Sequence, residues 1–263
     1  LKSGAITTTQ FLDVNERVGG FDSDGNLTAR RTVADTGALK ASYEMGRIGS
    51  GSGGLATTPI LHMRAYAEPA GDIHTIYNDI KIREQLKRAN GNADNQVIWL
   101  FPNPGLAPLL GLGTAQQLVL VDLLKNSFLA RLTLMTQWLD AIGADAAPLT
   151  PAKVVRLKPA DAVDSCWGVT DAVRHRETAT LDGANACNAI YPKTVPPRVV
   201  AGSPVTDDVV KCQLKPIADA DYAPAAFTTP EKVRLAAVFA DGVCDYAKPG
   251  IAQSTVKATW LKY

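Results

Sequence analysis

The sequence predicts an α/β protein, and three observations within residues 58–103 support this prediction. A short apolar run at residues 59–63 is followed by a turn-rich segment and then by a helical pattern of apolar residues. A second apolar run, residues 96–101, reads QVIWLF, as expected of a strand that is buried on both faces. Parallel strands need a crossover between them, usually a helix. We therefore expect a β-loop-α-β unit with parallel strands.

The helix expected inside this unit has an apolar stripe made of Tyr77, Ile80, Leu86 and Ala89. Its start is expected to be capped by the side chain of Asn78 or Asp79. The pair Asn90-Gly91 supplies a C-terminal stop, because glycine readily adopts the left-handed conformation found there.

Upstream of this unit, the sequence predicts turns and one short helix. The segment 19–28 alternates Asp and Asn, but an EF-hand loop counted from Gly20 would have glycine first and Arg31 twelfth. We therefore expect a turn that joins two extended pieces. A short helix at residues 38–45 is expected to end at Gly46.

The glycine-rich run at residues 46–54 is expected to be a loop that leads into the first strand. It lacks the lysine of a Walker phosphate loop. No serine in it stands at the centre of G-x-S-x-G, so it is no nucleophile elbow either.

Downstream, residues 114–140 predict one or two helices that cover a sheet face. A further helix is expected at residues 230–239, with Thr229 as its cap and Pro230 at its first position. We expect two domains, residues 1–147 as the α/β part and residues 148–263 as a disulfide-containing cap or tail packed on it.

Composition excludes several function classes. The 263 residues are 46% hydrophobic and 20% charged, which is typical of soluble globular chains. The net charge of +1 and the lack of a long basic run argue against nucleic acid or an anionic membrane as partner. No apolar run approaches the length of a membrane span.

The four cysteines are Cys166, Cys187, Cys212 and Cys244, and none forms C-x-x-C. With only three histidines in the chain, no zinc-ligand spacing emerges, and we expect neither a metal site nor a cofactor. Two disulfides are expected, in one of three possible pairings, of which the sequential one is 166–187 with 212–244. Disulfides indicate an oxidising compartment, so we expect a secreted or periplasmic protein; four free thiols in a cytosolic protein are the alternative.

The candidate chemistry lies on the loop after the first expected strand, where Asp72 and His74 stand two residues apart. In open α/β sheets, acids and bases on such loops usually perform the chemistry. A direct Asp72–His74 hydrogen bond needs a bent loop, which Gly71 allows. Glu68 or Asp94 are alternative orienting acids.

The other two histidines are weaker candidates. His175 lies in a polar segment and is a second candidate base, whereas His62 lies inside an apolar strand run and is expected to be structural. A hydrolytic triad also needs a nucleophile. Leu1 excludes an N-terminal nucleophile at this terminus, and no G-x-S-x-G elbow occurs in the chain.

Several segments resemble the C-terminal part of a bacterial domain-of-unknown-function family. These are large exported proteins that look related to α/β-hydrolases of the esterase or tannase kind. The resemblance covers nearly the whole chain, and its most distinctive motifs are DIHT, KCQLKP and GVCDY. The segments that carry it are residues 29–49, 70–99, 196–217 and 239–251.

This resemblance implies export, disulfides between tail cysteines, and a hydrolase-like sheet whose first half comes from elsewhere. Asp72 and His74 match the family's DIH motif, which makes His74 the first choice as base and Asp72 its orienting acid. The chain starts without methionine, which fits removal of a signal peptide or of a whole upstream domain, or an arbitrary boundary of the sequence. The resemblance favours the C-terminal portion of a processed protein, paired with an upstream N-terminal chain or segment.

The predicted fold class is therefore the C-terminal portion of an α/β-hydrolase-like sheet with a disulfide-stapled, loop-rich tail. The predicted function is hydrolysis of a small-molecule or polymeric ester by a Ser-His-Asp triad. Its serine would lie in an upstream segment or partner chain, as in a heterodimer. The alternative is a non-catalytic binding or assembly subunit of an exported protein.

Overall fold

The computed structural model describes residues 1–258, which divide into two compact units. The larger unit is Ile48–Asp208, and the smaller unit combines Leu1–Arg47 with Val209–Lys257. The domain boundary after residue 147 that the sequence suggests stays a prediction.

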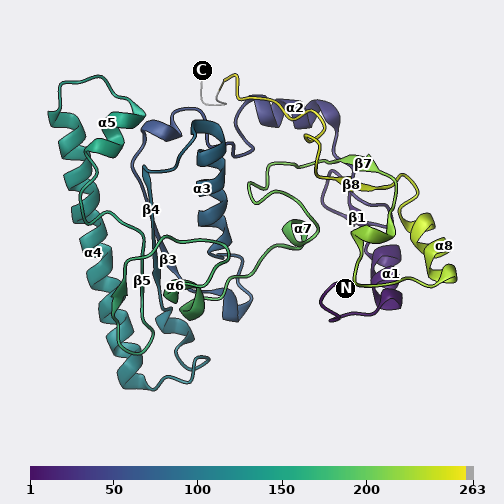
Figure 1. Ribbon diagram of the computed structural model, residues 1–263, viewed down its shortest axis with the longest axis horizontal. Helices are drawn as coiled ribbons and strands as arrows, with labels where there is room; N and C mark the ends of the chain where they lie inside the picture. The colour runs from purple at the N-terminus through teal and green to yellow at the C-terminus, as the bar shows by residue number, and fades with distance from the viewer. Residues whose placement is uncertain (259–263) are drawn as a thin grey trace. The chain divides into compact units, whose positions relative to one another are not determined.

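A mixed four-stranded sheet forms the centre of the larger unit (Figure 1). Its strands, in spatial order, are β3 (Ile60–Ala65), β4 (Gln96–Phe101), β5 (Ser165–Trp167) and β6 (Arg174–His175). The β3–β4 and β4–β5 pairs are parallel, whereas β6 runs antiparallel to β5. The predicted parallel β-loop-α-β unit is confirmed, and the strand expected at residues 96–101 has the predicted limits.

Helices cover both faces of this sheet. The crossover helix α3 (Tyr77–Asn90) lies on one side, and α4 (Thr114–Ala144) lies on the other with α5 (Pro151–Arg156) (Figure 1). The tract expected to form one or two helices is thus a single helix of 31 residues. Within residues 1–258, neither α4 nor another helix is long and apolar enough to span a bilayer.

The alternation of β4 side chains builds two cores, one on each face. Ile98 and Leu100 face α3 and pack with its buried Ile80. Their neighbours in sequence face α4 and α5, in a cluster made of Val97, Trp99, Phe101, Leu134, Trp138 and Val154. Because every β4 side chain is buried, each large apolar one contributes about 1.5–3 kcal/mol to stability.

The predicted start of α3 is wrong in one respect. Its N-cap residue is Ile76, which supplies no side-chain cap. Asn78 donates to the Ile73 carbonyl instead, and the Asp79 carboxylate accepts hydrogen bonds from strand β3. The predicted end is confirmed, because Gly91 is the C-cap with a φ of 81°.

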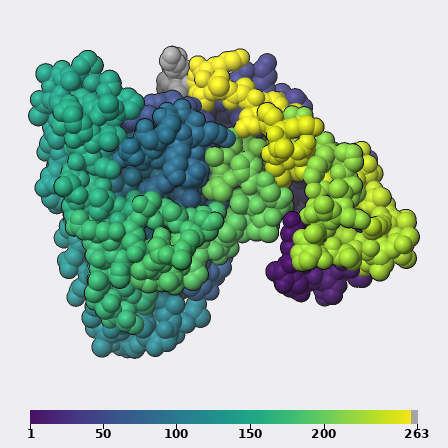
Figure 2. Space-filling model, in the orientation of Figure 1, coloured from purple at the N-terminus to yellow at the C-terminus, as the bar shows by residue number. Residues whose placement is uncertain are grey.

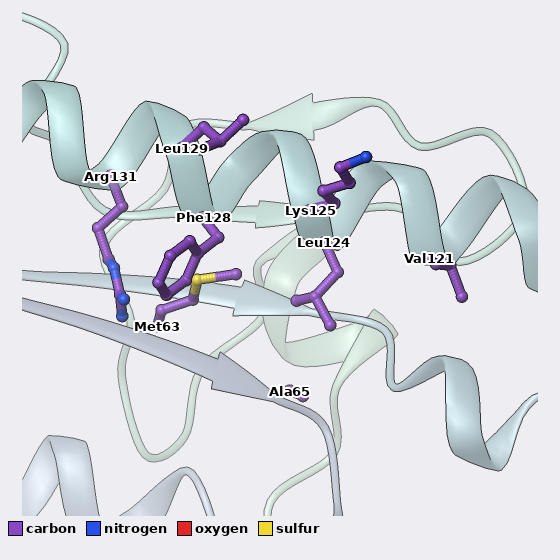
Figure 3. A pocket seen from close by; sticks show the side chains of 8 residues that line it. All are labelled: Met63, Ala65, Val121, Leu124, Lys125, Phe128, Leu129 and Arg131. Atoms are coloured by element: carbon purple, nitrogen blue, oxygen red, sulfur yellow. The ribbon is translucent and has the colours of Figure 1, made fainter.

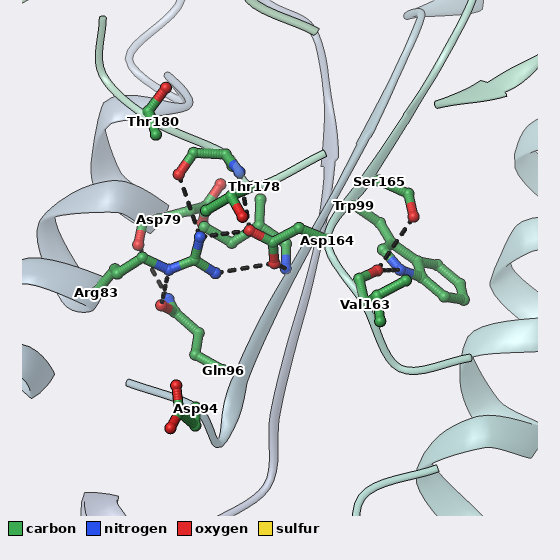
Figure 4. A network of polar contacts seen from close by, with 12 residues as sticks. Asp79, Arg83, Asp94, Gln96, Trp99, Val163, Asp164, Ser165, Thr178 and Thr180 are labelled. Carbon is green, nitrogen blue, oxygen red and sulfur yellow. Dashed lines mark hydrogen bonds and ion pairs between the residues drawn. The ribbon is translucent and has the colours of Figure 1, made fainter. Parts of the chain in front are cut away.

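A buried polar network ties α3 to the segment before β5 (Figure 4). The Arg83 guanidinium forms a bidentate ion pair with Asp164, and its Nε donates to Gln96 Oε1 at 3.0 Å. Asp164 also accepts from the backbone N–H groups of Ile98 and Ala179 at 2.8 Å each. Since both charges are paired and hydrogen-bonded, the network fixes the position of β5 next to β4.

Loops and short helices complete the larger unit. They are η1 (Leu55–Thr57), η2 (Glu68–Ala70), η3 (Pro104–Leu106), α6 (Ala186–Ile190) and α7 (Pro197–Val200). The glycine-rich run at residues 46–54 is a loop, as predicted. A disulfide joins Cys166 in β5 to Cys187 in α6.

The smaller unit contains helices and two antiparallel strand pairs, β1–β2 and β7–β8. Its elements are α1 (Thr8–Arg17), β1 (Gly20–Phe21), β2 (Leu27–Thr28), α2 (Thr36–Glu44), β7 (Gln213–Lys215), η4 (Asp219–Asp221), α8 (Thr229–Val238) and β8 (Val243–Asp245). Its core contains Leu12 of α1 and Leu235 of α8. The second disulfide links Cys212 and Cys244, so two disulfides are present and the pairing is the sequential one.

The sequence predictions for the turn at residues 19–28 and for the cap of α8 differ in their outcome. The turn at residues 19–28 does join two extended pieces, β1 and β2. The cap predicted for α8 is wrong by one residue, because Thr228 is the N-cap. Thr228 forms a capping box with Glu231, which is possible only when the cap stands three residues before the glutamate.

Candidate active site at the carboxyl end of strand β3

The loop after β3 is folded by its own polar groups. Pro69 lies in the single turn η2, and Gly71 ends that turn with a φ of 67°. The Glu68 carboxylate accepts hydrogen bonds from the backbone N–H of Ile76 at 2.8 Å and from that of Ala67 at 3.2 Å. Glu68 therefore holds the two ends of the loop together and places the residues between them at the carboxyl edge of the sheet.

Asp72 and His74 lie at the tip of this loop and contact each other directly. Asp72 Oδ1 accepts a hydrogen bond from the His74 backbone N–H at 2.7 Å. The same oxygen is 2.5 Å from Nδ1 of the imidazole. The backbone bond, followed by the imidazole bond, holds the pKa of the Asp72 carboxyl below its ordinary value. The bent loop that a direct Asp72–His74 contact requires is present.

This arrangement orients the imidazole. A carboxylate accepts only, so Nδ1 carries the proton of the hydrogen bond, and in the neutral ring Nε2 is the free base. Within residues 1–258, Nε2 has no hydrogen-bond partner, and the His74 side chain is 71% exposed. The pair can take up a proton from a group that approaches from outside.

A second His–Asp pair lies deeper, between β3 and α3. His62 Nδ1 donates to Asp79 Oδ1 at 2.6 Å. The Arg64 guanidinium donates two hydrogen bonds to the same carboxylate, from Nε to Oδ2 and from Nη2 to Oδ1, each at 2.7 Å. The Asp79 side chain is 1% exposed, so this cluster belongs to the interior.

Opposing effects set the charge state of the Asp79 carboxyl. Burial alone raises its pKa, but the hydrogen bonds and charges of Arg64 and His62 outweigh burial and leave the pKa below its ordinary value. The hydrogen bond with Asp79 in turn raises the pKa of Arg64. Asp79 is thus an ionised, fully paired carboxylate, which fits the structural role expected of His62.

A model of the tannase-like family of unknown function, DUF6351, matches residues 1–255. The chain belongs to this family. Neither the curated proteins nor the solved structures contain a significant match to it. Membership in a tannase-like family fits a hydrolase in a general way, and the two disulfides fit an extracellular or periplasmic protein.

Within residues 1–258, the other sequence candidates of this tannase-like chain form no hydrogen bond or ion pair with the Asp72–His74 pair. The Glu68 carboxylate accepts its hydrogen bonds from backbone N–H groups of the loop. Asp94 precedes β4, so it stands at the amino end of a strand parallel to β3, whereas His74 follows the carboxyl end of β3. His175 lies in β6 opposite Cys166. The structure therefore brings together only Asp72 and His74 among the candidates.

The same edge of the tannase-like chain holds polar groups that sequence reasoning missed. Tyr66 directly follows β3, and its hydroxyl donates to the Pro192 carbonyl at 2.7 Å. Its ring lies edge-on to Tyr191, with centroids 5.1 Å apart. Burial lowers the pKa of the neighbouring Lys193 ammonium. Spacing in sequence gives no signal for these contacts, because more than a hundred residues separate Tyr66 from the others.

No metal centre is found in the part of the chain that the structure describes. Within residues 1–258, no group of three or more His, Cys, Asp or Glu side chains is arranged to hold an ion.

Proposed function

We propose that this chain supplies the base and the orienting acid of an ester hydrolase, with His74 as base and Asp72 as its partner. The nucleophile is a serine from another segment of the same precursor or from a partner chain. The observation that carries this proposal is the contact between His74 Nδ1 and Asp72 Oδ1. Membership in a tannase-like family supports ester hydrolysis as the reaction class.

The chemistry assigned to the two residues follows from their geometry. The serine Oγ attacks the ester carbonyl while His74 Nε2 accepts the hydroxyl proton, and the imidazolium then returns that proton to the leaving alcohol. Asp72 accepts a hydrogen bond from the proton-bearing Nδ1 and stabilises the positive ring. The lowered pKa of the Asp72 carboxyl keeps it ionised during this cycle.

The position of the pair also favours this function. The loop that holds it follows a parallel strand, and in open α/β sheets the groups that act on substrates gather at the carboxyl ends of such strands. This placement supports a hydrolase-like sheet. Because His74 is 71% exposed on this chain, the proposed substrate class includes small-molecule and polymeric esters. We also propose secretion or periplasmic export, which the two disulfides support.

The decisive experiment is His74→Ala in the natural protein, with all the segments it contains. We expect the rate of ester hydrolysis to fall by about 10²- to 10⁴-fold, the usual contribution of a general base. His175→Ala is the matched control, because it removes an imidazole from the same unit without touching Asp72. Unchanged turnover in His74→Ala would rule out the assignment.

A second candidate function is a non-catalytic binding or assembly subunit. The high exposure of His74 favours it, because catalytic bases usually stand in pockets that exclude water. The cleft of about 640 Å³ found in the larger unit is lined by β3 and α4 residues and does not include His74. Labelling with a serine-directed fluorophosphonate separates the two candidates, since a pure binding subunit does not react.

A further inference from the structure

Strand β3 is one of the two edge strands of the four-stranded sheet, and one side of its backbone faces away from β4. Ile60 donates its N–H to the Asn95 carbonyl, and Tyr66 donates to the Phe101 carbonyl. In a parallel pair, alternate residues direct both peptide groups to the same neighbour. The even-numbered residues of β3 therefore bond to β4, and the odd-numbered residues direct their N–H and C=O groups to the open edge.

The odd-numbered residues are Leu61, Met63 and Ala65, and within residues 1–258 their N–H groups have no acceptor. Natural proteins usually protect an open edge with charged side chains or a covering element. The polar side chains of β3 do not protect this open edge. His62 and Arg64 lie on the sheet face that is covered by α3, where they bind Asp79. All six β3 residues are half-buried, whereas all of β4 is buried.

An apolar cleft adjoins this open edge. It encloses about 640 Å³ and lies between β3 and α4, with Met63 and Ala65 from the strand and Leu124 and Phe128 from the helix in its wall. Figure 3 shows the Met63 side chain beside the Phe128 ring, with Arg131 reaching down toward the strands. Side chains of an added strand would enter the cleft while its backbone pairs with the edge.

The outer face of α4 extends the apolar surface. Large apolar side chains stand exposed at helical spacing: Leu118, Val121, Phe128, Leu129, Leu132 and Leu139. Atoms of the α4 region, in teal, form one side of the larger unit's surface in Figure 2. An exposed apolar stripe beside an open edge is typical of a docking surface.

The charges at the cleft indicate which partner fits. Lys125 and Arg131 line it, and no carboxylate does. Within residues 1–258, neither cation has an ion-pair partner, although Arg131 lies over the Phe128 ring. A two-fold copy of this chain would set the cations against each other. Helix α4 contains two acids, Asp122 and Asp140, and neither lines the cleft. A strand flanked by a carboxylate fits instead.

We propose that the open edge of β3 and the α4 cleft bind one β-strand of the partner segment that carries the nucleophile. That strand has apolar residues at alternate positions, which fill the cleft beside Met63 and Phe128, and a carboxylate that pairs with Arg131 or Lys125. In naming this segment, the inference rests on the proposed function. The added strand also extends the sheet next to the Asp72–His74 loop.

The test is amide hydrogen exchange at single-residue resolution in the natural protein, with all its segments present. We expect the amides of Leu61, Met63 and Ala65 to be protected from exchange to the same degree as the even-numbered amides of β3. The reason is that the added strand accepts their hydrogen bonds. Phe128→Glu should then speed exchange of the odd amides by at least about 10²-fold. The even amides should stay protected, which shows that the larger unit is still folded.

Leu149→Glu is the matched control, because Leu149 is exposed after α4 and does not line the cleft. It should leave all six amides unchanged. Odd amides that exchange at the rate of a free chain in the natural protein would overturn the proposal. Protection that depends on protein concentration, with a native mass of two copies, would overturn it in favour of a self-dimer. If the odd amides are protected but His74→Ala retains ester turnover, the docking surface stands and the proposed function fails.

Discussion

The larger unit contains two His–Asp pairs that are alike in bond length and opposite in setting. His74 Nδ1 is 2.5 Å from Asp72, and His62 Nδ1 is 2.6 Å from Asp79. The Asp72 side chain is 44% exposed, whereas that of Asp79 is 1% exposed. Hydrogen-bond length alone does not separate a structural pair from a candidate catalytic pair.

The difference lies in what else contacts each carboxylate. Asp79 accepts three bonds from two cationic or cation-forming side chains, so its charge is matched inside the protein. Within residues 1–258, Asp72 accepts hydrogen bonds from one residue, His74, and the pair is exposed to solvent. A pair whose partners are all internal stabilises the fold, while a pair with a free nitrogen at the surface can transfer a proton.

The largest effect is expected from Asp79→Asn, which tests the structural half of this comparison. The substitution preserves shape but removes the negative charge, so the half-buried Arg64 loses the carboxylate that it binds directly. Breaking a buried ion pair from one side costs about 3–5 kcal/mol. We expect the free energy of unfolding, measured with urea, to fall by roughly that amount. A loss below about 1 kcal/mol would mean that Asp79 does not stabilise the fold.

A smaller effect is expected when pH is varied, and it again concerns Asp79. Its pKa in the folded protein lies below the ordinary value of 3.8, so the unfolded chain binds the proton more readily. The stabilisation is therefore complete above about pH 4 and is lost as pH falls through the lower folded pKa. The free energies of unfolding of the parent protein and of Asp79→Asn should differ most at neutral pH and should converge below about pH 4. A constant difference down to pH 2 would contradict this explanation.

The parts of the structure that sequence patterns predicted are those that depend on neighbours along the chain. The apolar run of β4 and the helical stripe of α3 are each visible within a few residues, and Gly91 marks the end of α3. The Asp72–His74 contact is equally local, because it joins residues two positions apart. The cap of α8 is also indicated locally, by a glutamate three residues after Thr228, although the prediction placed that cap one residue too late.

The parts that sequence patterns missed depend on how elements pack. Asp79 is 17 positions from His62, and they meet only because α3 lies across β3 in one particular register. The same packing explains the wrong cap of α3, since a carboxylate engaged with Arg64 is not available to the helix N-terminus. The open edge of β3 also depends on packing, because strand order is a property of the folded sheet.

The smallest effect on stability is expected from Asp72→Asn, which sharpens the other half of the comparison. Its hydrogen bonds join residues two positions apart in an exposed turn, and such local bonds also form in unfolded chains. Although the pKa of Asp72 is lowered, the difference between folded and unfolded protein is therefore small and screened by solvent. We expect the urea midpoint to match that of Asp94→Asn, an exposed aspartate at the opposite end of the sheet. Under the proposed function, ester turnover should nevertheless fall in Asp72→Asn and not in Asp94→Asn, because Asp72 is the carboxylate that contacts His74 within residues 1–258. A marked loss of stability in Asp72→Asn would assign the exposed pair to the same structural class as the buried one and remove the basis for calling it an active site.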